Sequence, residues 1–370
     1  MSEWEETQAE FYMQECFDLA KSALGRTSPN PIVGAIVLDK NNDPVGKGFH
    51  QKSGEDHAEV IALKEAGDSS KGGTLIVNLE PCCHYGKTPP CTDLIIKSGI
   101  KEVIFSNYDP NELVDHKGEK ILKENNINVI SGVLENEGNE INKFFFKWCK
   151  TKMPWVTLKQ AQTLDGKVGM LNKGNIKITG KESDNEVHKL RNEFDAVMVG
   201  ANTVIRDNPY LTVRNIEGRN PIRIILDTNL KTNPESNVYN NEAPTILITS
   251  DDVDGNRTNR YKSKNSNLKV IAISKDNNDK LNLKKVFEEL GKNNILSVLV
   301  EAGPSLSSNL ISDNLIDEFI IFTSPKFLGE TNTISSMKLE TNKINSQSYN
   351  LRVYNHKVIG NDFMITLRNN

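Results

Sequence analysis

The 370-residue sequence has few cysteines, no long apolar run and no basic, apolar leader. A secretory signal peptide begins with basic residues followed by an apolar stretch, whereas this chain begins with the acidic residues Glu3, Glu5 and Glu6. No segment approaches the roughly 18 consecutive apolar residues that span a bilayer. Five cysteines are an odd number, which argues against a disulfide-stapled secreted fold. We therefore expect a cytoplasmic protein without a membrane partner.

A dinucleotide fingerprint and a basic N-terminal half are missing as well. The G-x-G-x-x-G pattern of Rossmann domains does not occur. Residues 1–150 contain 16 Lys and Arg against 24 Asp and Glu, a net charge of −8, and the rest of the chain has a net charge of +4. Proteins that bind nucleic acid usually present a basic face to the phosphates. The charge distribution therefore disfavours a nucleic-acid partner and favours a small-molecule substrate.

The composition is typical of a soluble globular protein, with 37% hydrophobic and 25% charged residues. The length predicts two domains. An apolar-aromatic helix has residues 144–148 as its last part, and we place the boundary after it. The two domains are then residues 1–150 and 151–370. The sequence is also compatible with assembly into a homo-oligomer.

Helical and extended patterns alternate in the first half, which predicts an α/β sheet covered by helices on both faces. A helix is expected over residues 5–24. Strands are expected over residues 32–38, 74–79, 102–106 and 127–130, and residues 39–43 have the composition of a hairpin turn.

One histidine and two cysteines of the first half form a candidate metal site. His57 is followed by Glu59, and Pro81-Cys82 comes directly after the strand predicted at residues 74–79. One imidazole and two thiolates, with Cys91 as the second thiolate, can hold zinc and leave a fourth position for water, as in catalytic zinc sites. Glu59 is then available to move protons for that water. The order H-x-E…P-C…C is the signature of zinc-dependent deaminases and predicts hydrolytic deamination.

The spacing of the cysteines differs from the common P-C-x-x-C form, because eight residues separate Cys82 from Cys91. Cys83 and His84 are therefore alternative ligands. Cys83 directly follows Cys82 and is expected to point away from the metal. His84 is expected to face the substrate or to have a structural role.

Strand-to-helix junctions of the second half suggest an anion site. Strands are expected over residues 155–159, 196–200 and 295–300. Gly303-Pro304-Ser305 follows the last of these before a helix, and such a junction presents backbone N–H groups to a dinucleotide pyrophosphate. Three arginines could bind a substrate phosphate through their guanidinium groups: Arg191, Arg206 and Arg214.

Together these motifs resemble the bifunctional deaminase–reductase family of riboflavin biosynthesis along essentially the whole chain. The most specific stretches are residues 27–35, 57–59, 80–91, 163–167, 199–204, 207–214 and 300–306. In that family the P-C-x₈-C spacing is the rule. The resemblance implies a cytidine-deaminase-like N-terminal domain and a dihydrofolate-reductase-like C-terminal domain. It implies deamination of 2,5-diamino-6-ribosylamino-4(3H)-pyrimidinone 5′-phosphate, followed by NADPH-dependent reduction of the ribosyl side chain to ribityl.

The resemblance also assigns residues. His57, Cys82 and Cys91 would bind Zn²⁺, Glu59 would be the proton donor and acceptor, and Asn30 would contact the pyrimidine. The residues expected to line the NADPH site are Ala161, Thr203, Asp207, Thr228, Gly303, Pro304, Ser305 and Leu306. The residues expected to hold the reductase substrate are Arg191, Leu211, Arg214 and Glu301.

The chain departs from the family pattern at a few positions. Glu112 and His116 replace a proline and a glycine, and Lys177 replaces a tryptophan expected to contact NADP. Asp184 and Asn185 replace an Ala-Arg pair. An alternative hypothesis is therefore a deaminase whose C-terminal domain has lost reduction and serves as a binding or structural module. A deaminase of nucleic-acid bases is a third, disfavoured by the acidic first half.

Overall fold

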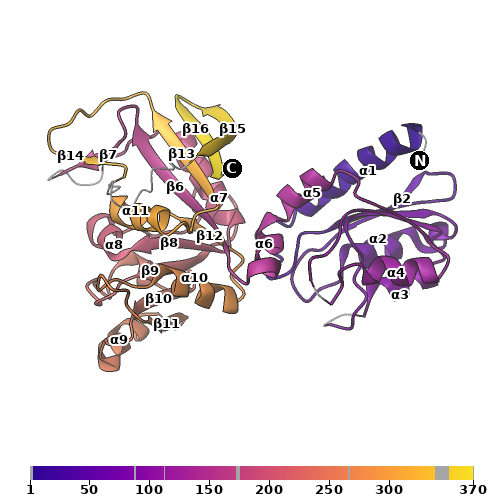
Figure 1. Ribbon diagram of the computed structural model, residues 1–370, viewed down its shortest axis with the longest axis horizontal. Helices are drawn as coiled ribbons and strands as arrows, with labels where there is room; N and C mark the ends of the chain where they lie inside the picture. The colour runs from indigo at the N-terminus through magenta and orange to yellow at the C-terminus, as the bar shows by residue number, and fades with distance from the viewer. Residues whose placement is uncertain are drawn as a thin grey trace. The chain divides into compact units, whose positions relative to one another are not determined.

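The computed structural model describes residues 3–86, 89–111, 113–171, 176–265, 267–337 and 350–369. Three residues of the sequence motifs lie outside this description: Lys87, Thr88 and Glu112. The chain divides into two compact units, Met1–Lys152 and Met153–Asn370 (Figure 1). Among the described residues, no helix is long and apolar enough to cross a membrane.

The N-terminal unit contains a five-stranded sheet in the order β2-β1-β3-β4-β5. β1 pairs antiparallel with β2 and β3, whereas β3, β4 and β5 are parallel. The strands are β1 (Gly34–Leu38), β2 (Pro44–Phe49), β3 (Thr74–Leu79), β4 (Glu102–Asn107) and β5 (Asn128–Ser131). The helices are α1 (Glu3–Lys21), α2 (Ala58–Ala66), η1 (Gly67–Ser70), α3 (Cys91–Lys97), α4 (Lys117–Glu124), α5 (Glu135–Ile141) and α6 (Lys143–Thr151).

Helices cover both faces of this sheet (Figure 1). Alternate residues of a strand point to opposite faces, so Ala35 and Val37 of β1 pack in a cluster with α2 and α3. Ile36 and Leu38 of the same strand pack in a cluster with α1. This arrangement confirms the α/β architecture expected from the sequence and leaves the carboxyl ends of the central strands open for a site.

The C-terminal unit contains a nine-stranded sheet in the order β11-β10-β9-β8-β12-β6-β13-β16-β15 and a two-stranded sheet of β7 and β14. Its first seven strands are parallel, and the last two add antiparallel. The strands are β6 (Trp155–Thr163), β7 (Lys167–Met170), β8 (Ala196–Gly200), β9 (Ile222–Leu226), β10 (Thr245–Ser250), β11 (Leu268–Ile273), β12 (Ser297–Val300), β13 (Glu318–Ser324), β14 (Thr333–Ser335), β15 (Leu351–Ile359) and β16 (Asp362–Asn369). The helices are α7 (Lys181–Glu193), α8 (Ala201–Asp207), η2 (Asn237–Tyr239), α9 (Gly255–Lys262), α10 (Leu283–Lys292) and α11 (Pro304–Ser312).

Two apolar clusters sandwich the parallel part of this sheet. Met198 of β8 packs in a cluster with α10 and α11, and its neighbour Val199 packs on the other side with Val204 of α8 and Tyr261 of α9. A parallel sheet buried on both faces binds ligands at the carboxyl ends of its strands. The ligand site of this unit is therefore expected where β6, β8, β9 and β12 end.

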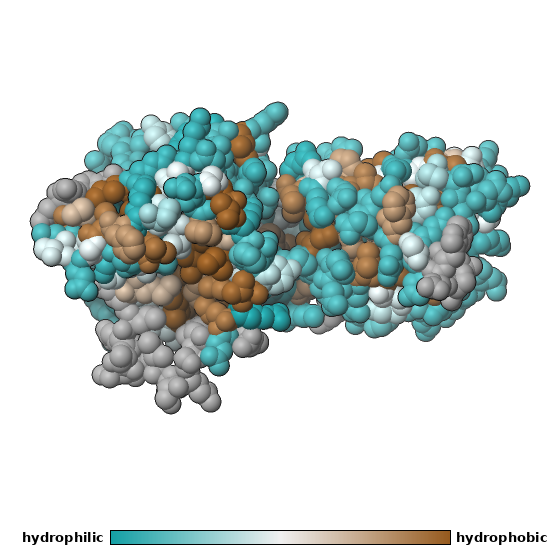
Figure 2. Space-filling model, turned by 90° about the horizontal axis from the view of Figure 1, so that it is seen from above, coloured by the Kyte–Doolittle hydropathy of each residue, from teal (hydrophilic) through white to brown (hydrophobic). Residues whose placement is uncertain are grey.

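Apolar surface is present at the same end of the sheet. Leu164 follows β6 and Phe327 follows β13, and their side chains are exposed, as is that of Leu171. The face in Figure 2 shows apolar side chains gathered on the C-terminal unit among polar ones. The Leu164 N–H donates to the Lys326 carbonyl, which joins the two loops.

Three expected elements are shorter than the sequence predicted. The strand expected over residues 295–300 is observed as β12, which begins at Ser297. The helix predicted over residues 5–24 ends at Lys21, where turns begin. The strand predicted from Ile32 begins at Gly34, because side chains rather than a neighbouring strand satisfy the Ile32 backbone. The Ile32 N–H donates to Asn142 Oδ1 (2.9 Å), and the Ile32 carbonyl accepts from the side-chain amides of Asn142 (3.0 Å) and Asn78 (3.1 Å).

Replacing Asn142 by alanine is expected to loosen the segment around Ile32. The substitution leaves a buried N–H without an acceptor, which costs about 1–3 kcal/mol. Hydrogen exchange of the full chain should show faster exchange of the Ile32 amide. Asn125→Ala, which removes an exposed bond to the Ile121 carbonyl, is the matched control. Unchanged exchange at Ile32 in Asn142→Ala would contradict the role of this asparagine.

Candidate functional site

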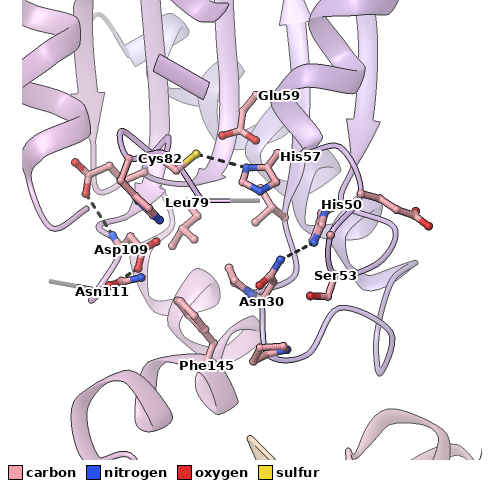
Figure 3. A pocket seen from close by; sticks show the side chains of 18 residues that line it. Asn30, His50, Ser53, His57, Glu59, Leu79, Cys82, Asp109, Asn111 and Phe145 are labelled. Atoms are coloured by element: carbon pink, nitrogen blue, oxygen red, sulfur yellow. Dashed lines mark hydrogen bonds between the residues drawn. The ribbon is translucent and has the colours of Figure 1, made fainter. Parts of the chain in front are cut away.

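Three potential metal ligands from distant parts of the N-terminal unit meet at one point. Figure 3 shows two of them, His57 and Cys82. His57 immediately precedes α2, Cys82 follows β3, and Cys91 is the first residue of α3. The His57 Nδ1 lies 3.3 Å from the Cys91 Sγ and 3.5 Å from the Cys82 Sγ. All three ligand atoms lie within 4.8 Å of one another, and in the described part of the chain no other such group occurs.

The protonation of this group fits a bound cation. A hydrogen bond from the Cys91 thiol lowers the pKa of Cys82 to about 4, and the bond to Cys82 raises the pKa of His57 to about 9. The bond between Cys91 and Cys82, together with burial, raises the pKa of Cys91 well above its usual value. Cys82 is thus a thiolate, Cys91 a thiol and His57 an imidazolium. A metal ion that binds these side chains would displace the protons on Cys91 and His57. Two sulfur donors and one nitrogen donor are a ligand set that zinc prefers.

Glu59 lies in the first turn of α2 and is not one of the three ligands. Its side chain is 4% exposed and lines the pocket beside the metal group (Figure 3). Burial raises the pKa of its carboxyl, and the charge of Cys82 raises it further. A carboxyl group held in this way can take up a proton from water and return it to a departing group.

A pocket of about 290 Å³ opens beside the metal ligands. This volume lies at the small end of the range for ligand sites. Asn30, which the family resemblance implies contacts the pyrimidine, lines this pocket, and so does His50, which no sequence motif indicates. The His50 Nδ1 donates to the Asp56 carbonyl (3.1 Å), so its Nε2 accepts from the Asn30 Nδ2 (3.0 Å). These bonds fix which way the Asn30 amide faces.

The alternative metal ligands lie elsewhere. The Cys83 thiol donates to the Leu113 carbonyl (3.6 Å), away from the metal group. His84 lines the pocket without joining that group, as do Asp109 and Asn111, which follow β4. Cys91 is therefore the second sulfur donor, and the sequence could not establish this because spacing alone does not give a side chain's direction.

Two adjoining cavities, of about 990 and 770 Å³, lie at the carboxyl ends of the strands in the C-terminal unit. Both are lined by Thr203, Arg206, Gly303 and Pro304, so they form one continuous site. The larger cavity also contains the predicted residues Thr228, Ser305 and Leu306. The smaller cavity contains the other predicted residues of this unit: Ala161, Arg191, Asp207, Leu211, Arg214 and Glu301.

A nearly buried charge cluster lies at the end of β12. Arg191 of α7 forms a two-pronged ion pair with Glu301, with Nε–Oε1 and Nη2–Oε2 distances of 2.6 and 3.1 Å. Lys159 of β6 lies 3.3 Å from the same carboxylate. Burial alone would raise the pKa of Glu301, but Arg191 and Lys159 outweigh it and hold that pKa well below its usual range. Glu301 is therefore an anion that fixes two cations at the cavity wall. Lys159 was not among the predicted site residues.

The three arginines expected at a phosphate differ in their partners. Arg191 is committed to Glu301, and Arg206 pairs with Asp207 through two bonds of 2.8 and 2.9 Å. The Arg214 guanidinium lies 5.0 Å from the centre of the Tyr210 ring and donates to Thr212 Oγ1. Among the described residues it has no carboxylate partner, so it is the arginine best placed to bind an anion.

Comparisons with known proteins agree with this geometry. The family described as the RibD C-terminal domain matches residues 154–365, and the cytidine and deoxycytidylate deaminase zinc-binding region matches residues 6–107. The riboflavin biosynthesis protein RibD of Aquifex aeolicus is 42% identical over 96% of both chains. This chain belongs to the RibD family.

Solved structures of RibD proteins share the fold of the whole chain. RibD of Acinetobacter baumannii has a TM-score of 0.88 at 33% identity, with 99% of both chains covered. A diaminohydroxyphosphoribosylaminopyrimidine deaminase/5-amino-6-(5-phosphoribosylamino)uracil reductase from Thermotoga maritima has a TM-score of 0.86 at 35% identity, with 99% of this chain and 100% of that one covered. The chain is therefore a bifunctional enzyme, with a cytidine-deaminase-like domain and a dihydrofolate-reductase-like domain.

Two departures from the RibD pattern face each other in the structure. Lys177 and Asp184 both line the smaller cavity, and the Lys177 Nζ lies 2.5 Å from the Asp184 carboxylate. Both side chains are partly exposed, and such surface ion pairs contribute little to stability. The pair places a polar contact at the cavity rim, at the position where the resemblance implies a tryptophan.

Replacing Cys91 by serine should reduce the zinc content of the purified chain, because a hydroxyl is a much weaker zinc ligand than a thiolate. Metal analysis should find Cys91→Ser depleted and deaminase activity lost with it. The matched control is Cys83→Ser, at the neighbouring thiol outside the group, which should retain its zinc. Full zinc in Cys91→Ser together with loss in Cys83→Ser would reverse the assignment.

Proposed function

We propose that this enzyme carries out two successive steps of riboflavin biosynthesis. The N-terminal domain removes the 2-amino group of 2,5-diamino-6-ribosylamino-4(3H)-pyrimidinone 5′-phosphate with water, releasing ammonia. The C-terminal domain then reduces the ribosyl side chain of the product to ribityl with NADPH. The observation that carries the proposal is that each domain has its own pocket, lined by the residues its reaction requires.

The residues of the N-terminal pocket can bind and deaminate a pyrimidine. His57, Cys82 and Cys91 would hold zinc, which when bound supplies the Lewis acidity that lets water lose a proton near neutral pH. Glu59 takes that proton and passes it to the ring nitrogen, and it then carries the remaining proton of the added hydroxyl to the departing amine. Asn30, held by His50, offers an oriented amide to the edge of the ring.

The larger C-terminal cavity suits a phosphorylated dinucleotide. The N-terminal end of α11 opens into it, and no side chain caps that end, so the backbone N–H groups of Ser305 and Leu306 remain available for a pyrophosphate. Three cations line this cavity together with four carboxylates: Arg206, Lys231, Lys280, Asp227, Asp276, Asp279 and Asp313. The choice of NADPH over NADH therefore rests on the family resemblance. The nicotinamide cofactor supplies the hydride when bound.

The smaller C-terminal cavity suits the phosphorylated sugar. Arg214 would bind the 5′-phosphate, and Glu301 with its two cations would fix the sugar beside the cofactor. The hydride goes to C1 of the ribose, and the ring oxygen takes up a proton as the ring opens. The chain's own contribution is to align C1 with the cofactor.

The two other hypotheses are less well supported. A C-terminal domain without reductase activity would not need to keep an intact charge cluster around Glu301 and a continuous double cavity. A deaminase of nucleic acid would need a basic surface around the zinc pocket, and the first 150 residues are strongly acidic. Assembly into a homo-oligomer stays a prediction.

Replacing Glu59 by glutamine tests the proposal, because the amide cannot move the proton. With the diamino substrate, ammonia release should fall by about 100-fold or more, while zinc content stays unchanged. With the deaminated product as substrate, the same variant should oxidise NADPH at the wild-type rate. Normal ammonia release by Glu59→Gln, or no NADPH oxidation by the wild-type chain, would contradict the proposal.

A further inference from the structure

Helix α7 presents a row of polar side chains to the smaller cavity of the reductase domain. Asp184, His188 and Arg191 all line this cavity, at spacings of four and three residues, which place them on one face of a helix. Asp184 and Arg191 have ion-pair partners there. His188 is 5% exposed, and none of the steps described above uses it.

His188 contacts the segment that carries the phosphate-binding arginine. The backbone N–H of Arg214 donates to the His188 Nδ1 at 3.1 Å. One helical turn further along α7, the Arg191 Nη1 donates to the Thr212 carbonyl at 3.2 Å. The helix therefore holds alternate residues of the 208–215 loop, although 26 positions separate His188 from Arg214.

The loop needs such support, because it lacks regular secondary structure and contains a strained residue. Leu211 has a φ of 57°, in the left-handed region that non-glycine residues rarely adopt, and its side chain is buried. Conformations of this kind persist only where surrounding contacts impose them. Thr212 and Arg214 lie within three positions of Leu211, and their bonds to α7 help to impose its conformation. The bonds of Val213 to Asn220 and of Asn208 to Asn237 also hold the loop.

The helix itself is fixed at its N-terminal end. The Asp362 carboxylate, from the first residue of β16, accepts from the Gly180 N–H (2.7 Å) and the Ser183 hydroxyl (2.6 Å). The bond from Gly180 satisfies one of the backbone N–H groups that the first turn of a helix leaves without partners. The ring of His188 is thus carried by a rigid element, whereas its partner belongs to a loop.

We propose that His188 is a positioning residue of the reductase reaction, whose neutral ring accepts the Arg214 backbone N–H and thereby fixes the Arg214 guanidinium where the phosphate of the substrate binds. This inference rests on the reductase function proposed above. It assigns to His188 no contact with the reacting atoms.

The bond requires an unprotonated Nδ1. Four charged groups surround the ring: Arg191 and Arg214 oppose its protonation, and Glu301 and Asp184 favour it. Burial and the two arginines prevail and hold the pKa of His188 below its usual value. The ring therefore gains a proton only at a more acid pH than an ordinary histidine. Protonation would turn the acceptor into a donor that opposes the Arg214 N–H.

Steady-state kinetics of the full chain, with the deaminated phosphorylated substrate and NADPH varied separately, test the proposal. In His188→Leu the KM for the phosphorylated substrate should rise roughly tenfold, as expected for loss of one buried acceptor, and the KM for NADPH should stay unchanged. In His188→Asn, whose side-chain oxygen can replace Nδ1, the KM should return toward the wild-type value. On acidification the wild-type KM should rise more steeply than that of His188→Asn, because the phosphate of the substrate, which titrates at about pH 6, affects both alike.

Two controls separate positioning from folding. Ammonia release by the deaminase domain of the same variant shows whether the chain is correctly folded, and His356→Leu changes an exposed histidine of β15 without effect on either KM. An unchanged substrate KM in His188→Leu would overturn the proposal. So would a rise confined to NADPH, or an equal rise in His188→Asn. Failure of the wild-type chain to oxidise NADPH would instead contradict the reductase function on which the inference rests.

Discussion

Burial of the parallel strands on both faces is the constraint on which both active sites depend. Such strands can present side chains to a ligand only where they end, because their faces are filled by helices. In the deaminase domain Cys82 follows β3 and Asp109 follows β4, and helices α2 and α3 bring His57 and Cys91 to the same point. In the reductase domain the ends of β8, β9 and β12 line the double cavity.

Each site is then held in place by polar groups that the helices and loops supply. In the deaminase domain the buried carboxylate of Glu80 accepts backbone N–H groups of Asp109, His116 and Glu119, which fixes the loop that bears Asp109 and Asn111 beside the pocket. In the reductase domain Glu301 orients Arg191. A buried anion with several donors is costly to disturb, since removing it leaves each donor without a partner. Both sites are therefore preorganised before any ligand binds.

The sequence predicted most of what local patterns determine. Short motifs next to predicted strands encode the zinc ligands, Glu59 and the junction at Gly303, and the structure places them at the expected strand ends and helix starts. The alternation of helical and extended patterns encodes the α/β class. The sequence could not choose between Cys91 and its rivals from spacing alone. It also missed His50 and His188, because each acts through a partner distant in sequence and neither belongs to a motif. In the sequence, Lys177 and Asp184 are two separate departures from the family pattern, and nothing there indicates that they form an ion pair.

The central claim is that one chain exchanges an amine for oxygen at one site and adds a hydride at another. Mass spectrometry of the product formed by the purified, zinc-loaded chain from the diamino substrate tests it most directly. Without NADPH, the product should have lost one amino group and gained one oxygen, with the sugar unchanged. With NADPH, the same product should in addition contain two more hydrogen atoms, located on the former ribosyl chain. Two results would contradict the account: a product that is reduced but not deaminated, or a product that is deaminated only when NADPH is present.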